Sequence, residues 1–213
     1  HGLSFEEGAA LPETVFTVFA NVFEHGRLVL GETLLVHGAN SGIGVAAIQM
    51  AAAAGARVIG TCRGADRADA LRALGAERII DTTAEDFGQA VRDLGGADVI
   101  LDMVGDRYLQ PNLAALNTDG RIVYIAALDG PTLQVPVMAL MRKRAVLTGS
   151  TLRNRSADEK ARLARRVEEV VWPWVAGGKV TPVVEAVFPL QDAAKAHARL
   201  EAGSHLGKII LTC

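Results

Sequence analysis

The chain has 213 residues; half are hydrophobic and 22% are charged, so it can bury a core that needs neither disulfides nor metals. The formal net charge is −2 and the basic residues are spread along the chain, which excludes nucleic acid as an expected partner. Two cysteines, Cys62 and Cys213, cannot form a disulfide framework and predict a reducing, cytoplasmic compartment.

The first predicted element is a helix over residues 11–23. Pro12 suits its first turn, because a helix needs no N–H donor there. The apolar residues recur at helical spacing along one face: Val15, Phe16, Phe19, Val22 and Phe23.

From residue 33 the pattern changes to short apolar runs that alternate with helical stretches. The runs are 33–37, 57–61, 78–81, 98–102, 121–125 and 146–149, and the helical stretches between them are 42–54, 65–74, 84–94 and 107–116. Strands that are apolar throughout predict a parallel sheet covered on both faces. We therefore expect an α/β fold: a doubly wound Rossmann domain with a six-stranded parallel sheet.

One uncharged stretch is long enough to cross a bilayer, since no charged residue lies between Glu32 and Arg57. Asn40, Ser41 and three glycines interrupt it, at positions 38, 42 and 44. A strand, a turn and a buried helix explain the stretch better, so we expect no membrane partner.

The alternation of strands and helices ends after residue 149. Ser156 and Glu159 form a predicted capping box, and the helix that follows ends at Gly177-Gly178, with its last turn loosened by Pro173. A strand over 180–187, a helix over 191–200 and a strand over 208–212 come next. These three elements are too few for a separate domain and predict a short C-terminal appendix.

The strongest motif is the glycine-rich turn that follows the first strand. Residues 33–44 read Thr-Leu-Leu-Val-His-Gly-Ala-Asn-Ser-Gly-Ile-Gly. Glycines allow a tight turn and a close backbone approach to a diphosphate, and the helix N-terminus supplies free N–H groups. The alternative is an ordinary tight turn, but its place in the first βαβ unit favours nucleotide binding.

The second strand predicts which nucleotide is bound. A domain that prefers NAD places a carboxylate at the end of this strand, whereas here Arg63 follows it and Arg67 lies nearby. Guanidinium groups pair with a 2′-phosphate, so the pattern favours NADPH. The alternative is that both arginines are solvated surface charges.

Other catalytic templates fail. The chain has no Gly-x-Ser-x-Gly elbow, and neither Tyr108 nor Tyr124 has a lysine four residues later. The histidines show no metal-ligand spacing, and His197 is expected to be a packed, hydrogen-bonded residue of an alanine-rich helix. We therefore predict no catalytic residue and no metal ligand.

Residues 37–49 resemble the medium-chain dehydrogenase/reductase superfamily, in its zeta-crystallin-like quinone oxidoreductase branch. Further matches follow in the same order along the chain: residues 74–76, 102–105, 112–113, 120–121, 196–197 and 205–211. The resemblance implies hydride transfer from NADPH to a quinone or a related enone. It implies no zinc, because Glu13 stands where zinc-dependent relatives have a cysteine ligand.

The resemblance also implies which residues bind the coenzyme. The diphosphate turn falls on Ser41, Gly42 and Ile43, with Asn40 in the same turn, and the 2′-phosphate position falls on Arg67, near Arg63. The positions that line the ribose and nicotinamide are Thr17, Val104, Ile125, Ala126, Leu128, Ser150 and Leu152.

Members of this superfamily begin with a GroES-like, barrel-like catalytic domain, which is absent from this sequence. The resemblance therefore implies a linker helix at 1–29, a Rossmann NADP-binding domain at 30–180, and at 181–213 an appendix that normally belongs to the catalytic domain. It implies poor activity of this half alone, an exposed apolar face and a homodimer paired through the sixth strand.

Two alternatives remain open. The chain could be the enoyl-reductase module of a fatty-acid or polyketide assembly line, which shares this fold and coenzyme. It could also be a non-catalytic nucleotide-binding module, which would bind NADPH without turnover.

Overall fold

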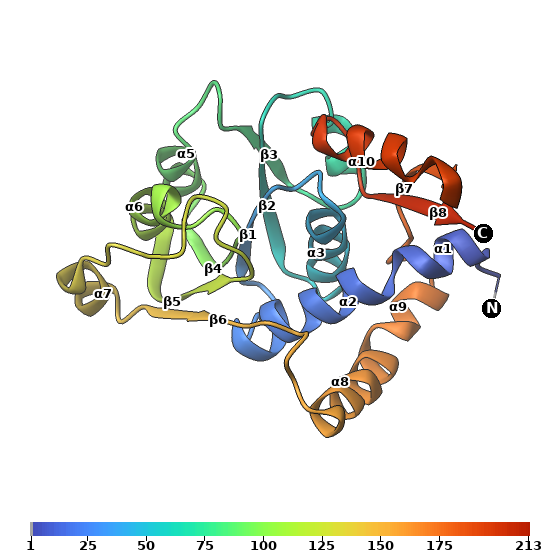
Figure 1. The fold of residues 1–213 in the computed structure, drawn as a ribbon. Coiled ribbons are helices and arrows are strands. Elements are labelled where there is room, and N and C mark those ends of the chain that lie inside the picture. The colour runs from blue at the N-terminus through green and yellow to red at the C-terminus, as the bar shows by residue number, and fades with distance from the viewer. Residues whose placement is uncertain (1) are drawn as a thin grey trace.

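A six-stranded parallel sheet forms the centre of the molecule (Figure 1). In the computed structural model, which describes residues 2–213, its strands are β1 (Thr33–His37), β2 (Arg57–Cys62), β3 (Arg78–Asp81), β4 (Ala97–Asp102), β5 (Leu116–Tyr124) and β6 (Val146–Gly149). Their order is β3-β2-β1-β4-β5-β6, with every pair parallel. This confirms the predicted doubly wound sheet, whose order reverses between β1 and β4.

Helices cover both faces of the sheet. Alternate strand residues point to opposite faces, so Leu34 and Val36 join one core cluster while Leu35 joins the other. The first face packs against α3 (Gly42–Ala53) and α4 (Ala68–Ala73), and the second against α5 (Phe87–Asp93) and α6 (Asp106–Ala115). No helix in the described part of the chain is long and apolar enough to cross a membrane.

The N-terminal residues form three consecutive helical pieces. These are α1 (Phe5–Ala10), α2 (Pro12–Val18) and the π-helical turn η1 (Phe19–His25). The predicted helix thus starts where expected, with Pro12 in its first turn, but its second half is π-helical. Val15 and Val18 are buried in the same core cluster as α3, so this segment packs as part of the sheet's covering layer.

A buried ion pair fastens the end of η1 to the sheet. Arg121 of β5 is 8% exposed, and its guanidinium lies 2.7 Å from the Glu32 carboxylate. Arg121 Nε also donates to the carbonyl oxygen of Gly26 at 2.6 Å, and Nη2 donates to that of Arg27 at 3.0 Å. One side chain thereby joins β5, the residue before β1 and the loop after η1.

The segment after β6 departs from its predicted form at one point. The capping box of Ser156 and Glu159 opens α8 (Ala157–Val170), as predicted. The helix then breaks at Val171, and a separate α9 (Trp172–Ala176) follows. Pro173 sits in the first turn of α9, because that is where a residue without an N–H is tolerated. Helix α7 (Val137–Lys143), between β5 and β6, was not predicted.

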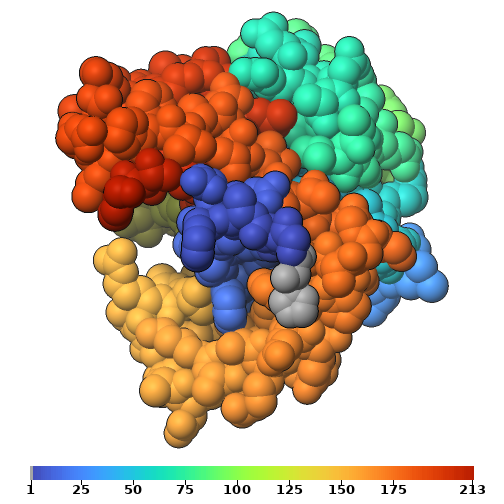
Figure 2. Space-filling model, turned by 90° about the vertical axis from the view of Figure 1, so that its right-hand side faces the viewer, coloured from blue at the N-terminus to red at the C-terminus, as the bar shows by residue number. Residues whose placement is uncertain are grey.

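The C-terminal residues form a small unit beside the N-terminal helices. It consists of β7 (Val184–Pro189), a 3-10 turn η2 (Leu190–Asp192), α10 (Ala193–Glu201) and β8 (Lys208–Thr212), with β7 and β8 paired in parallel. The predicted strand over 180–187 begins only at Val184. Helix α1 contacts β7 and β8, and Figure 2 shows the blue N-terminal helices directly against this red segment. The proposed domain boundaries at 29/30 and 180/181 stay predictions.

Candidate functional site

The glycine-rich turn joins β1 to α3 in a conformation that demands glycine at two positions. Gly38 has a φ of +64°, in the left-handed region. A Cβ at Gly44 would lie 2.4 Å from the carbonyl oxygen of Gly38, too close for any side chain. Ser41 caps the helix, since its Oγ accepts the N–H of Gly44 at 3.0 Å.

The first turn of α3 presents a free hydrogen-bond donor. The backbone N–H of Ile43 has no acceptor among residues 2–213, whereas that of Gly42 faces the carbonyl oxygen of Gly207 across a parallel bridge. Both stand at the N-terminus of a 12-residue helix, where the aligned peptide dipoles favour an anion. Both residues line a cleft that a ligand can enter.

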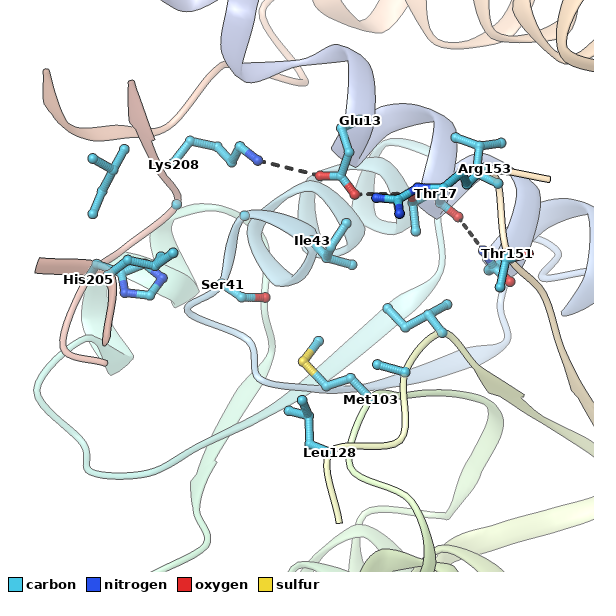
Figure 3. Close-up of a pocket in the computed structure, with 18 of the residues that line it drawn as sticks. Glu13, Thr17, Ser41, Ile43, Met103, Leu128, Thr151, Arg153, His205 and Lys208 are labelled. Atoms are coloured by element: carbon cyan, nitrogen blue, oxygen red, sulfur yellow. Dashed lines mark hydrogen bonds and ion pairs between the residues drawn. The ribbon is translucent and has the colours of Figure 1, made fainter. Parts of the chain in front are cut away.

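The main cleft has a volume of about 600 Å³ and lies over the carboxyl ends of β1 and β4. Its walls come from α2, the glycine-rich turn, the segments after β4, β5 and β6, and the C-terminal unit. Figure 3 shows Glu13 and Lys208 facing one another on one side, with Met103 and Leu128 opposite. The predicted coenzyme residues that line it are Thr17, Ser41, Gly42, Ile43, Ile125, Ala126, Leu128, Ser150 and Leu152.

A second cavity of about 200 Å³ holds the three other polar residues of the prediction. Asn40, Arg63 and Arg67 line it. The remaining lining residues are Cys62, Gly64, Asp66, Gly203 and Ser204. Two arginines and one carboxylate therefore share this space, with one wall from the turn after β2 and the other from residues 203–204.

Val104 is the one predicted site residue that lines neither space. Its N–H donates to Asp102 Oδ1 at 2.6 Å, and its carbonyl oxygen accepts the N–H of Asp129 at 2.8 Å. The preceding residue, Met103, lines the main cleft in its place.

The C-terminal unit is fastened directly to the glycine-rich turn. The N–H of Gly207 donates to the carbonyl oxygen of Asn40 at 2.9 Å, and a parallel bridge joins Gly207 to Ser41. The Asn40 amide donates in turn to the carbonyl oxygen of His205 at 3.0 Å. The Asn40 side chain thus clamps the C-terminal unit over the turn.

Charged and polar residues missed by sequence reasoning also line the cleft. Lys208 Nζ lies 3.4 Å from Glu13 Oε2, and Thr17 Oγ1 donates to Glu13 Oε1 at 3.4 Å. Glu13 sits on α2 and Lys208 on β8, far apart in the chain, so no local spacing could have joined them. Residues 205–208 were quoted only as part of a family motif.

The two histidines of the C-terminal unit also line the cleft. The prediction of a packed, hydrogen-bonded His197 was wrong: its side chain is exposed and makes no hydrogen bond within the described chain. Helix α10 is buried only at Ala196, so the neighbouring position faces out. His205 Nδ1 is buried and has no partner among residues 2–213; burial and the nearby Arg199 lower the pKa of its ring.

A buried hydrogen-bond chain supports the floor of the cleft at the ends of β1, β2 and β4. The Asn112 amide donates to Asp102 Oδ2 at 2.6 Å, so its oxygen faces His37 Nε2, 2.8 Å away. His37 Nε2 therefore carries the proton, and Nδ1 accepts from the Thr61 hydroxyl at 2.8 Å. Burial lowers the pKa of His37, which keeps its ring neutral.

The described residues do not supply a metal site. Among residues 2–213, no three His, Cys, Asp or Glu side chains gather closely enough to hold a metal ion. The carboxylate of Glu13 is paired with Lys208.

The chain is similar in sequence to known oxidoreductases and to a polyketide synthase. A family model described as "Zinc-binding dehydrogenase" matches residues 42–169. The chain is 30% identical to the quinone oxidoreductase of Mus musculus over 98% of this chain; it spans 63% of that relative's length. It is 29% identical to the highly reducing polyketide synthase easB of Emericella nidulans, over 99% of this chain and 8% of the synthase.

A solved structure shows the same likeness in three dimensions. The quinone oxidoreductase of Thermus thermophilus, whose structures include a complex with NADPH, superimposes with a TM-score of 0.89 at 30% identity. The match covers 100% of this chain and 68% of that one.

Proposed function

Because the chain belongs to the zinc-binding dehydrogenase family, we propose that it forms the coenzyme-binding part of an oxidoreductase that transfers hydride from NADPH to a quinone or a conjugated carbonyl. The observation that carries this proposal is the first turn of α3, which lines the main cleft and in which the N–H of Ile43 has no acceptor among residues 2–213.

The glycine-rich turn suits a dinucleotide diphosphate. The N–H of Ile43 would donate to one of its oxygens, and the positive end of α3 would stabilise its charge. Lys208 adds a cation, since its side chain passes over Gly42. The absence of a Cβ at Gly44 keeps the turn tight, because any larger residue would push Gly38 and Ala39 away.

The apolar end of the cleft suits a nicotinamide ring. NADPH would supply the hydride there, and the chain's own residues would hold the ring. Met103, Ile125 and Leu128 give this end an apolar lining, and Thr17 gives it a hydroxyl. The buried chain of His37, Asn112 and Asp102 fixes the turn that carries Met103, because Asp102 Oδ1 accepts the N–H groups of Val104 and Gly105.

The second cavity suits the 2′-phosphate of NADPH. Arg63 and Arg67 line it, and a phosphate there would sit between two guanidinium groups. We infer a zinc-independent reaction, because the carboxylate of Glu13 is paired with Lys208. We place the protein in a reducing, cytoplasmic compartment on the strength of its cysteines, Cys62 and Cys213, both of which are free thiols.

The experiment that tests the coenzyme is calorimetric titration of the folded chain with NADPH and with NADH. Arg67→Ala should weaken NADPH about tenfold and leave NADH nearly unchanged, because only NADPH carries the phosphate that this side chain meets. No heat with either coenzyme would sink the proposal, and equal losses for both would remove Arg67 from the phosphate site.

A second candidate acceptor is an enoyl thioester. The likeness to a highly reducing polyketide synthase over nearly the whole chain favours it. Steady-state assays of the complete protein with quinones and with enoyl thioesters separate the two. NADPH binding without turnover on either would leave a non-catalytic nucleotide-binding module.

A further inference from the structure

Arg67 does not project freely into the second cavity. Its Nη2 donates to Glu185 Oε1 at 3.2 Å and to the carbonyl oxygen of Ser204 at 3.1 Å. Glu185 belongs to β7 of the C-terminal unit, and its side chain is only 15% exposed, against 40% for Arg67. A carboxylate from the far end of the chain therefore already occupies a donor that a 2′-phosphate would use.

Glu185 has further partners that hold it in place. Arg199 of α10 donates from Nη2 to the same oxygen, Oε1, and from Nη1 to Ser204 Oγ at 2.9 Å. The other carboxylate oxygen, Oε2, accepts the N–H of Leu206 at 3.2 Å. If Arg67 leaves, Arg199 and the backbone still satisfy the buried charge, so the Arg67–Glu185 contact can open at small cost.

The C-terminal unit cannot carry this carboxylate away from the cavity. Asn40 and Ser41 hold residues 205–207 against the glycine-rich turn, and Gly203 approaches Arg63. Arg63, Arg67 and Asp66 line the cavity, and Glu185, paired with both Arg67 and Arg199, stands behind Arg67.

We propose that Glu185 is a specificity-determining residue for the coenzyme. Its carboxylate competes with a 2′-phosphate for Arg67 and repels the phosphate through like charge, so it restrains the preference for NADPH over NADH. This inference rests on the proposed function, because it presumes a coenzyme whose phosphate reaches Arg67.

The test is Glu185→Gln, which keeps the shape and an acceptor oxygen but removes the charge. Calorimetry at low salt should give NADPH binding about three- to tenfold tighter than in the parent chain, with NADH changed less than about twofold. Glu168→Gln is the matched control: it makes the same charge change on an exposed part of α8 and should alter neither affinity.

The double variant Arg67→Ala/Glu185→Gln locates the effect. With Arg67 removed, the gain in NADPH affinity from Glu185→Gln should shrink to less than about twofold, because Glu185 and the 2′-phosphate no longer compete for the Arg67 guanidinium. Unchanged or weaker NADPH binding by Glu185→Gln, or a full gain without Arg67, overturns the role of Glu185. Failure of the parent chain to bind either coenzyme overturns the proposed function instead.

A second measurement needs no variant. In crystals of the parent chain grown with NADPH, Arg67 should leave Glu185 for the 2′-phosphate while Arg199 stays on Glu185. In crystals with NADH, Arg67 should stay on Glu185. An Arg67–Glu185 contact kept in both complexes would contradict the competition.

Discussion

At the scale of single residues, the turn before α3 shows how closely sequence and chemistry are linked. Gly38, Ser41 and Gly44 each have one local reason for their identity: a left-handed φ, a helix cap and a steric limit. Because these reasons act over a few neighbouring positions, the tight glycine-rich turn between β1 and α3 could be predicted from the sequence.

The partners of that turn could not be predicted in the same way. Asn40, in the turn, meets Gly203 across 163 positions of the chain, and Glu13 meets Lys208 across 195. Arg67 was predicted as a phosphate ligand from its place after β2, but the carboxylate that holds it comes from β7. Contacts of this kind follow from the fold and leave no trace in local spacing.

Gly44→Ala tests the steric limit in the turn. The added methyl would lie 2.4 Å from the carbonyl oxygen of Gly38 and 2.5 Å from that of Ala39, so backbone must move. We expect NADPH affinity to fall more than about tenfold by calorimetry, since the donors of α3 move with the turn. Gly8→Ala is the control, because nothing lies within 4 Å of its new methyl; equal affinities of both variants would disprove the limit.

The neutral, buried His37 predicts how stability depends on pH. Its pKa is lowered in the folded chain, so below the ordinary value of 6.5 only the unfolded chain takes up this proton. Stability is therefore fully present above pH 6.5 and falls as the pH drops, by up to about 1.4 kcal/mol per pH unit. His205, whose pKa is also lowered, acts in the same direction.

Urea denaturation between pH 7 and pH 5 measures this slope. His37→Gln should flatten it, whereas His197→Gln, an exposed position, should leave it as in the parent chain. The same slope in the His37 variant would show that this ring does not resist protonation.

At the scale of elements, a helix boundary could be predicted where the residues that determine it lie in the helix itself. The capping box of Ser156 and Glu159 is local, and α8 begins as predicted. The break at Val171 places Pro173 in the first turn of α9. The ring of Trp174, in α9, packs against Phe23 of η1, a contact distant in sequence that local spacing does not show. Helix α7 has no buried residue, so it offered no clear apolar face from which to predict it.

Arg121→Met tests the ion pair that joins β5 to η1. The variant leaves the carbonyl oxygens of Gly26 and Arg27 without this donor, and the Glu32 carboxylate with only the N–H of Val29. We expect a loss of about 3 kcal/mol in the free energy of unfolding, measured by urea denaturation.

Arg144→Met is the matched control, because the Arg144–Asp119 pair is exposed on both sides. Its loss should stay below about 1 kcal/mol. Similar losses in the two variants would mean that burial adds nothing to the Arg121 pair.

At the scale of the whole molecule, the sheet ends in a strand with one open edge. β6 pairs only with β5 among the described residues, and beside it α7 exposes apolar side chains: Val137 at 63%, Met138 at 57% and Met141 at 64%. An open edge next to an apolar surface favours pairing with a second copy of the chain. The homodimer through the sixth strand stays a prediction, and we propose that the apolar surface of α7 takes part in it.

Sedimentation velocity tests the dimer. We expect the parent chain to sediment as a dimer at micromolar concentration and Met141→Glu to sediment as a monomer, because a charge on this surface opposes its burial. Leu190→Glu, at an equally exposed position of the C-terminal unit, should stay dimeric. A monomeric parent chain at high concentration would refute pairing through this edge.

The contacts between Asn40 and residues 203–207 also bear on the stage of synthesis at which the candidate site is complete. A ribosome synthesises the turn at residues 38–44 early, yet the wall that closes over it follows 163 positions later. A sheet that folds during synthesis therefore does so before this wall exists, and the completed site depends on the last residues of the described chain.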